Sequence, residues 1–202
     1  MILKQILAGA LYNFSYIVAD EKTKEAAVID ASETDSILHS LEKDDLKLKY
    51  IISTHSHFDH ISFNEEIAKK TGAKIVLHKL AKTKKDVAVD DGDELQIGSL
   101  KIKIIHTPGH TRDGICLLVG NKLFTGDTLF VGECGRTDFP GGSSEQLYDS
   151  LEKIKKMDDR IEVYPGHNYG NRPHSTIGYE KKSNYTLKKR TKEEFVKFML
   201  EP

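Results

Sequence analysis

The 202-residue sequence is poor in the features that mark several protein classes. It contains no tryptophan, five prolines and two cysteines, Cys116 and Cys134. Two cysteines cannot build a disulfide-stapled scaffold, and they argue equally against a closed structural zinc site rich in cysteine. If a metal is bound, its ligands must therefore come from other residue types.

The chain also lacks an excess of charge of one sign. Its 30 Lys and Arg residues stand against 31 Asp and Glu residues, which gives a formal net charge of −1. Proteins dedicated to nucleic acids carry a basic surplus that neutralises phosphates, so we expect no nucleic-acid partner. The first residues show no basic segment followed by a long apolar run, so we expect no membrane partner and a cytoplasmic location.

What is present is the composition of a globular protein. Hydrophobic residues make up 38% of the chain and charged residues 30%, which is too apolar for disorder and too charged for a membrane protein. The length fits one domain, and no stretch has the composition of a linker. We therefore expect a single domain over residues 1–202.

Apolar periodicity predicts an α/β protein in which helices are interspersed among strands. Two helix starts carry capping signals, a predicted capping box at Ser143 with Gln146 and a cap at Thr191 with Glu194. Interspersed helices and strands favour two mixed sheets covered by helices. We predict strands over 2–7, 14–19, 25–30, 49–53, 74–78, 100–106, 115–119, 122–125 and 160–164, and helices over 34–41, 64–71, 143–157 and 191–200.

The strongest motif is Thr-His-Ser-His-Phe-Asp-His, which directly follows the predicted strand 49–53. It places His55, His57, Asp59 and His60 within six residues. In an extended segment the side chains of residues i and i+2 lie on one side, so His55 and His57 can bind one ion. A helical turn after them would direct Asp59 and His60 toward a neighbouring position, and the spacing thus suggests two adjacent metal sites.

Three further candidate ligands follow predicted strands. His110 and His167 each come after a Pro-Gly pair, which ends the strand and turns the backbone, and Asp127 follows a glycine in Phe-Thr-Gly-Asp. Strand ends of open α/β sheets form binding crevices, so these side chains are expected to converge. The remaining histidines are expected to be surface or capping residues: His39, His78, His106 and His174.

Together, the segments Thr-His-Ser-His-Phe-Asp-His, Thr-Pro-Gly-His-Thr, Thr-Gly-Asp-Thr-Leu-Phe and Tyr-Pro-Gly-His resemble the metal motifs of the metallo-β-lactamase-fold superfamily. From about residue 13 to 198 the chain is similar to the branch of short glyoxalase II (hydroxyacylglutathione hydrolase) and persulfide dioxygenase. This resemblance implies an α/β fold, an αββα sandwich of two mixed β-sheets flanked by helices. It also shows a departure, since Phe63 stands where the family carries a small residue, and we expect it to reshape the loop beside the site.

The resemblance also implies the roles of the candidate ligands. Two divalent ions, Zn and/or Fe, are expected, with Asp127 as their bridge and with Asp59 and Asp127 as the catalytic carboxylates. The first ion would be held by His55, His57 and His110, and the second by Asp59, His60 and His167.

Two activities are compatible with these motifs. The preferred one is a metal-dependent, glyoxalase II-like thioesterase that hydrolyses a glutathione-type or other small thiol thioester through a hydroxide shared by the two ions. The alternative is a mononuclear Fe(II) persulfide dioxygenase, whose facial triad would be His55, His110 and Asp127. In either case we expect a small-molecule partner and a monomer or homodimer.

Substrate contacts are expected from the segments near the ligands. Arg136 can anchor a carboxylate of the thiol carrier, because its fork binds carboxylates bidentately, or it can pair structurally with Asp138. Tyr169 is expected to line the same pocket. Cys134 has no paired histidine motif, and we expect it to pack beside the site rather than to act as a nucleophile.

Overall fold

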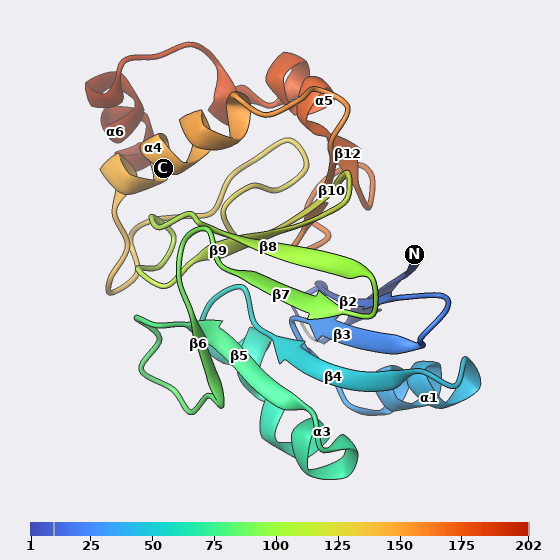
Figure 1. Ribbon diagram of the computed structural model, residues 1–202. Coiled ribbons are helices and arrows are strands. Elements are labelled where there is room, and N and C mark those ends of the chain that lie inside the picture. The colour runs from blue at the N-terminus through green and yellow to red at the C-terminus, as the bar shows by residue number, and fades with distance from the viewer. Residues whose placement is uncertain (10, 202) are drawn as a thin grey trace.

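The computed structural model describes residues 1–9 and 11–201, and its strands form two six-stranded mixed sheets (Figure 1). The expected sandwich of two mixed sheets between helices is confirmed. In the first sheet, β1, β2 and β3 pair antiparallel, whereas β3 to β6 pair in parallel. Its strands are β1 (Ile2–Ala8), β2 (Asn13–Ala19), β3 (Glu25–Ile29), β4 (Lys47–Ile52), β5 (Lys74–His78) and β6 (Val87–Val89), in that order.

The second sheet is built from the remaining strands in the order β12-β11-β10-β9-β8-β7. All of its pairs are antiparallel except β10 with β11. The hairpin predicted across Gly120 and Asn121 is formed by β9 and β10. The strands are β7 (Glu94–Ile97), β8 (Leu100–His106), β9 (Ile115–Val119), β10 (Lys122–Gly126), β11 (Glu162–Pro165) and β12 (Ser175–Thr176).

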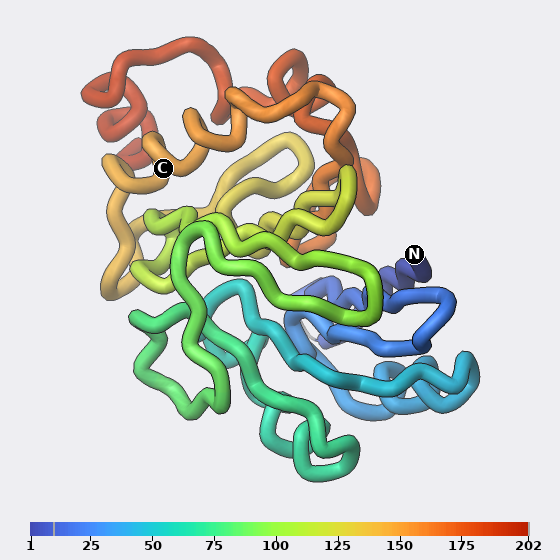
Figure 2. The backbone as a smooth tube through the Cα atoms, in the orientation of Figure 1, coloured from blue at the N-terminus to red at the C-terminus, as the bar shows by residue number. Residues whose placement is uncertain are grey.

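Helices cover the outer face of each sheet. Apolar residues of α1 and α3 pack on the first sheet, and those of α4, α5 and α6 pack on the second. The chain trace shows the same division, with the C-terminal helices on the side away from α1 and α3 (Figure 2). The helices are α1 (Asp35–Lys43), α2 (Phe58–Ile61), α3 (Asn64–Thr71), α4 (Ser144–Lys155), α5 (Ile177–Ser183), the 3-10 turn η1 (Tyr185–Leu187) and α6 (Lys192–Leu200).

A third apolar layer lies between the two sheets and holds them together. Tyr16 of β2 is its centre, because its ring meets Phe124 edge-on at 5.0 Å and Tyr164 at 5.7 Å. The Tyr16 hydroxyl donates to the carbonyl of Pro165 at 2.6 Å, which satisfies its buried polar atom. Burial of this layer fixes the two sheets face to face, and with them the strand ends that carry the motifs.

The structure differs from the prediction in short elements and in one cap. The strands β6, β7 and β12 and the helix α5 were not predicted, whereas the helical turn expected after His57 is formed by α2. Ser143 caps α4 by accepting from the backbone N–H of Gln146, but its own N–H donates to the carbonyl of Gly109 at 2.7 Å. The predicted capping box is therefore wrong at Ser143, whereas a complete box forms at Thr191 and Glu194.

One histidine prediction is also wrong. His78 was expected to be a surface or capping residue, but it ends β5 between β4 and β6 and is buried. Its ring stacks on His106 at 4.1 Å, and burial lowers the pKa of its imidazole.

Across the described residues, no helix combines the length and apolarity that a bilayer crossing requires.

Candidate metal centre

The four motifs meet at one edge of the sandwich. The segment with His55, His57, Asp59 and His60 follows β4 and continues into α2. The other three predicted ligands, His110, Asp127 and His167, follow β8, β10 and β11. The ligand atoms form groups of three, and within each group the atoms lie within 4.8 Å of one another. All seven residues therefore gather at this edge, as the sequence predicted.

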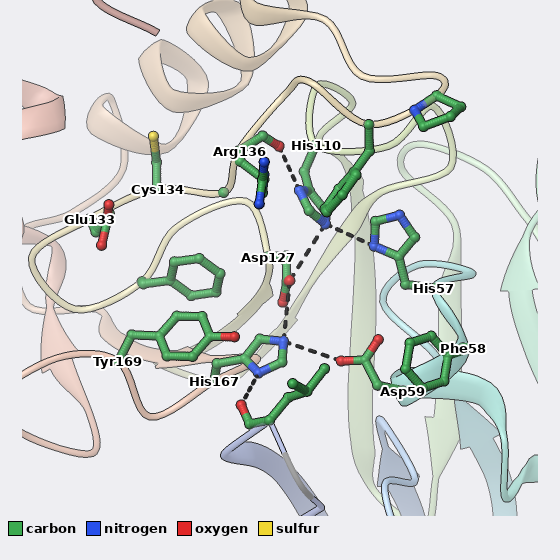
Figure 3. Close-up of a pocket in the computed structure, with 15 residues that line it drawn as sticks. His57, Phe58, Asp59, His110, Asp127, Glu133, Cys134, Arg136, His167 and Tyr169 are labelled. Atoms are coloured by element: carbon green, nitrogen blue, oxygen red, sulfur yellow. Dashed lines mark hydrogen bonds and ion pairs between the residues drawn. The ribbon is translucent and has the colours of Figure 1, made fainter. Parts of the chain in front are cut away.

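The first group consists of three imidazoles. His57 Nδ1 lies 3.0 Å from His55 Nε2. It also lies 3.0 Å from His110 Nε2 (Figure 3). A metal ion with bonds of 2.0–2.1 Å to tetrahedral ligands separates those ligands by about 3.3 Å. The nitrogen separations fit that geometry closely, so the group can hold one ion.

The second group combines two imidazoles with a carboxylate. His60 Nε2 lies 3.2 Å from His167 Nε2 and 3.3 Å from Asp59 Oδ2, and the His167 to Asp59 separation is 3.4 Å. Nitrogen and oxygen donors of this kind suit Zn, Fe and Mn. A second ion therefore fits beside the first.

Asp127 stands between the two groups. Its Oδ2 lies 3.5 Å from His110 Nε2 of the first group and 3.3 Å from His167 Nε2 of the second (Figure 3). Its Oδ1 is buried without a hydrogen-bond partner, 3.5 Å from His60 Nε2. A buried carboxylate oxygen without a donor is costly, and a cation is the partner that would satisfy it.

The electrostatics of the site favour ionised carboxylates. Burial would raise the pKa of Asp127, but the surrounding imidazoles, His60 foremost, bring it far below its usual range. Burial lowers the pKa of His55, which keeps this imidazole neutral and available as a ligand. His55 is thus a neutral nitrogen donor and Asp127 an anionic oxygen donor. At His60 and His167 burial would lower the pKa, but Asp30 and Asp127 raise it at His60 and Asp127 raises it at His167.

Backbone carbonyls orient two of the histidines. His110 Nδ1 lies 2.7 Å from the carbonyl of Arg136, and His167 Nδ1 lies 2.9 Å from the carbonyl of Leu11 (Figure 3). A carbonyl can only accept, so in each ring Nδ1 carries the proton and Nε2 is free to bind. Asn13 similarly orients Asp59, since its Nδ2 donates to Asp59 Oδ2 at 2.8 Å.

Asp30 is a supporting residue that the sequence analysis missed. It follows β3 and accepts from Thr54 through the backbone N–H at 2.7 Å and the hydroxyl at 2.8 Å. Its Oδ2 also lies 3.0 Å from His60 Nδ1, on the ring edge opposite the metal-facing nitrogen. The available signal was its position, because Asp30 ends a buried strand just as Asp127 does.

Two glycines allow the backbone to approach Asp127. A Cβ atom on Gly166 would lie 2.3 Å from Asp127 Oδ1, and one on Gly135 would lie 1.9 Å from the Asp127 carbonyl oxygen. Both contacts are impossible for a side-chain carbon, so only glycine fits at these positions. The glycine of the last Pro-Gly-His motif is thus required by this close approach.

A pocket of about 500 Å³ opens over both groups. Tyr169 lines it as predicted, and its ring lies parallel to that of His167 at 4.7 Å (Figure 3). Arg136 lines it too, but its guanidinium pairs with Asp138. The other lining residues are Leu11, His57, Phe58, Asp59, His110, Asp127, Phe130, Glu133, Cys134, Gly135, Phe139, Pro140 and His167.

Cys134 packs beside the pocket. Its Sγ lies 3.9 Å from the sulfur of Met199, and burial raises the pKa of its thiol to about 12. A thiol with such a pKa stays protonated at neutral pH and is a poor nucleophile. Phe63, expected beside the site, instead packs against the apolar layer between the first sheet and its helices, because it turns inward at the start of α3.

The loop after β10, which forms one wall of the pocket, is anchored by the C-terminal segment. The buried Glu180 accepts from the backbone N–H of Gly132 at 2.8 Å. Asn184 donates to the carbonyl of Glu133 at 3.0 Å and to Glu180 at 2.9 Å. These bonds fix the wall with respect to the helices on the second sheet.

Comparison with known proteins agrees with this geometry. The zinc-dependent hydrolase PksB of Bacillus subtilis, assigned to polyketide biosynthesis as probable, is 33% identical over 92% of the chain and 86% of its own length. The hydroxyacylglutathione hydrolase of Pelagibacter ubique is 39% identical over 82% of the chain and 70% of its own length. The persulfide dioxygenase ETHE1 of Bos taurus is 33% identical over 98% of the chain and 80% of its own length.

A solved structure gives the same result for the fold. The crystal structure of ETHE1 from Myxococcus xanthus superposes with a TM-score of 0.94 at 36% identity and covers 99% of this chain and 90% of that one. The sequence pattern of the metallo-beta-lactamase superfamily matches residues 8–167, which include all seven candidate ligands. The chain belongs to the metallo-beta-lactamase superfamily.

Proposed function

We propose that the protein is a metal-dependent thioester hydrolase that uses two divalent ions and acts on a glutathione-type or other small thiol thioester. The observation that carries this proposal is the position of Asp127, whose carboxylate contacts histidines of both groups. A ligand shared in this way is the arrangement of a two-metal site. The two relatives named as hydrolases support the same class of reaction.

When bound, the ions would lower the pKa of a water molecule and polarise the thioester carbonyl. The chain's own residues define how substrate reaches them. His57, Asp59, His110, Asp127 and His167 line the pocket, whereas His55 and His60 are not among the lining residues. The substrate is therefore presented to both groups from one side.

The two carboxylates Asp59 and Asp127 are the anionic ligands in this proposal. Both belong to the anionic donor set, and Asp127 holds the two groups in register because it reaches histidines on either side. Cys134 remains a protonated thiol, so no covalent step on the protein is needed. We propose no nucleic-acid or membrane partner, and the proposed oligomeric state is a monomer or a homodimer.

A mononuclear Fe(II) persulfide dioxygenase is the second candidate, because the ETHE1 structure superposes so closely. Its triad would be His55, His110 and Asp127, which leave open positions for persulfide and O₂. The ligand types are common to both activities, so the number of ions and the reaction must decide between them.

The deciding experiment measures metal content and two activities on one preparation purified without oxygen. We expect about two ions per chain and hydrolysis of acetyl thioesters of glutathione and of N-acetylcysteamine. We expect no oxygen uptake with glutathione persulfide. One iron per chain with persulfide-dependent oxygen uptake would replace the hydrolase proposal by the dioxygenase.

The pairing of Arg136 with Asp138 leads to a prediction about glutathione thioesters. Arg136 Nε donates to Asp138 Oδ1 at 2.6 Å, so the guanidinium is already occupied. Asp138→Asn should free it for a substrate carboxylate and lower KM by about two- to fivefold, the range of an exposed ion pair. Arg136→Ala should change KM less than about twofold.

The comparison uses the neutral N-acetylcysteamine thioester as its control. Neither variant should alter KM for that substrate, because it offers no carboxylate. A large rise in KM of Arg136→Ala for the glutathione thioester alone would instead show that Arg136 anchors the carrier in spite of Asp138.

A further inference from the structure

Four large apolar side chains that are exposed to solvent meet at the pocket. Leu11, Phe58, Phe139 and Tyr169 are 44%, 71%, 42% and 51% exposed, and all four line it. They come from four separate segments: the turn between β1 and β2, helix α2, the loop before α4, and the segment after β11. Single exposed apolar residues are ordinary, but a group around one cavity marks a binding surface.

The apolar side chains flank both candidate metal groups. The Phe139 ring meets the His57 ring edge-on at 5.6 Å, and Phe58 follows His57 directly in the chain. On the other side, Tyr169 stacks on His167 and meets Phe130 edge-on at 5.2 Å. A thioester carbonyl held between the groups would thus have apolar surface within reach of its acyl chain.

The charged side chains that line the pocket outside the candidate ligands already have polar partners. Outside the candidate ligands, the lining contains two charged residues, Glu133 and Arg136. Arg136 pairs with Asp138 and lies over the Phe139 ring at 4.5 Å, and Glu133 accepts from the Tyr185 hydroxyl at 2.8 Å. Few groups of the lining are therefore available to bind a charged substrate group, whereas its apolar side chains favour the binding of an apolar substrate group.

We infer that this pocket selects thioesters with an apolar acyl chain of several carbons over those with a short or polar acyl group. The inference rests on the proposed hydrolase function and names its substrate class. Complete burial of one methylene stabilises a complex by about 0.8 kcal/mol, or about fourfold in binding. Because the pocket wall is partly open, we expect about twofold in binding for each added methylene. Twofold for each of six added methylenes compounds to about 60-fold, so we expect at least about a tenfold gain even if only some of them contact the wall.

The first test is a chain-length series on the full chain loaded with zinc. The substrates are acetyl, butyryl, hexanoyl and octanoyl thioesters of N-acetylcysteamine, whose neutral carrier removes charge from the comparison. We expect kcat/KM to rise at least about tenfold from acetyl to octanoyl. A flat or falling series would overturn the inference.

The second test uses matched substitutions of Phe58, whose side chain is the most exposed of the four. Phe58→Gln should reduce the octanoyl advantage at least about threefold, whereas Phe58→Leu should keep it, because only the glutamine is polar. Leu80→Gln is the control, since Leu80 is 51% exposed and does not line the pocket. Metal content is measured in each variant, because Phe58 lies between two candidate ligands.

Binding of a non-hydrolysable probe separates this inference from the proposed function. S-octyl-N-acetylcysteamine, a thioether, should bind at least about tenfold more tightly than the S-ethyl compound in calorimetry, and Phe58→Gln should reduce that ratio. If the probe behaves so while no thioester is hydrolysed, the apolar pocket stands and the hydrolase proposal fails. If thioesters are hydrolysed without chain-length dependence in rate or binding, the inference fails and the hydrolase stands.

Discussion

Asp127→Ala is expected to remove most of the bound metal and to abolish thioester hydrolysis while the chain remains folded. The carboxylate contacts His60, His110 and His167, so its loss deprives both groups of a donor at once. Substitutions outside the direct ligands of metal sites cost about 10- to 100-fold, so loss of a shared ligand should exceed about 100-fold in activity. Metal analysis and far-UV circular dichroism measure the two effects.

Two further variants make the Asp127 result specific. Asp127→Asn keeps an oxygen donor and the shape of the side chain but loses the charge, so it should retain more metal than Asp127→Ala. Asp149→Ala controls for loss of metal or activity during purification, because Asp149 is exposed and pairs with Lys192 away from the pocket. Undiminished metal and turnover in Asp127→Ala would exclude this residue from the centre.

Much of the fold could be predicted because its long strands and helices carry strong local patterns. The predicted strand over 14–19 lies within β2, and the predicted helix over 64–71 has the bounds of α3. Strands such as β6 and β12 span three and two residues, too few to show an alternation. They are set by pairing with neighbouring strands, which a local pattern does not contain.

The residues of the candidate site also fall into those that a local sequence pattern predicts and those that it does not. Histidines delivered by Pro-Gly turns are visible in the sequence, because the turn residues and the ligand stand together. Asp30 was missed because its partners, Thr54 and His60, reach it only through the parallel pairing of β3 with β4. Phe58 and Phe139 were missed as pocket residues because an exposed aromatic residue has no local signature of what it faces.

His167→Ala should reduce the metal content from about two ions to about one and lower thioester hydrolysis at least about tenfold. The second group would keep Asp59 and His60 together with the shared Asp127, whereas the first group, with His55, His57 and His110, would stay complete. His167 is preferred to His60 for this test because it lines the pocket, while His60 is wholly buried and paired with Asp30. Metal analysis and steady-state rates give both numbers.

The same variant separates the two candidate activities, with His174→Ala as the matched control. His174 is exposed, stacks on Tyr164 at 5.2 Å and does not line the pocket, so its replacement should leave metal and rate unchanged. In a mononuclear dioxygenase, His167 is not a ligand, and His167→Ala would keep about one iron per chain and measurable oxygen uptake with glutathione persulfide. The two-metal centre instead requires that His167→Ala lose one ion and lose hydrolase activity, because the bridging Asp127 would then face a single occupied group.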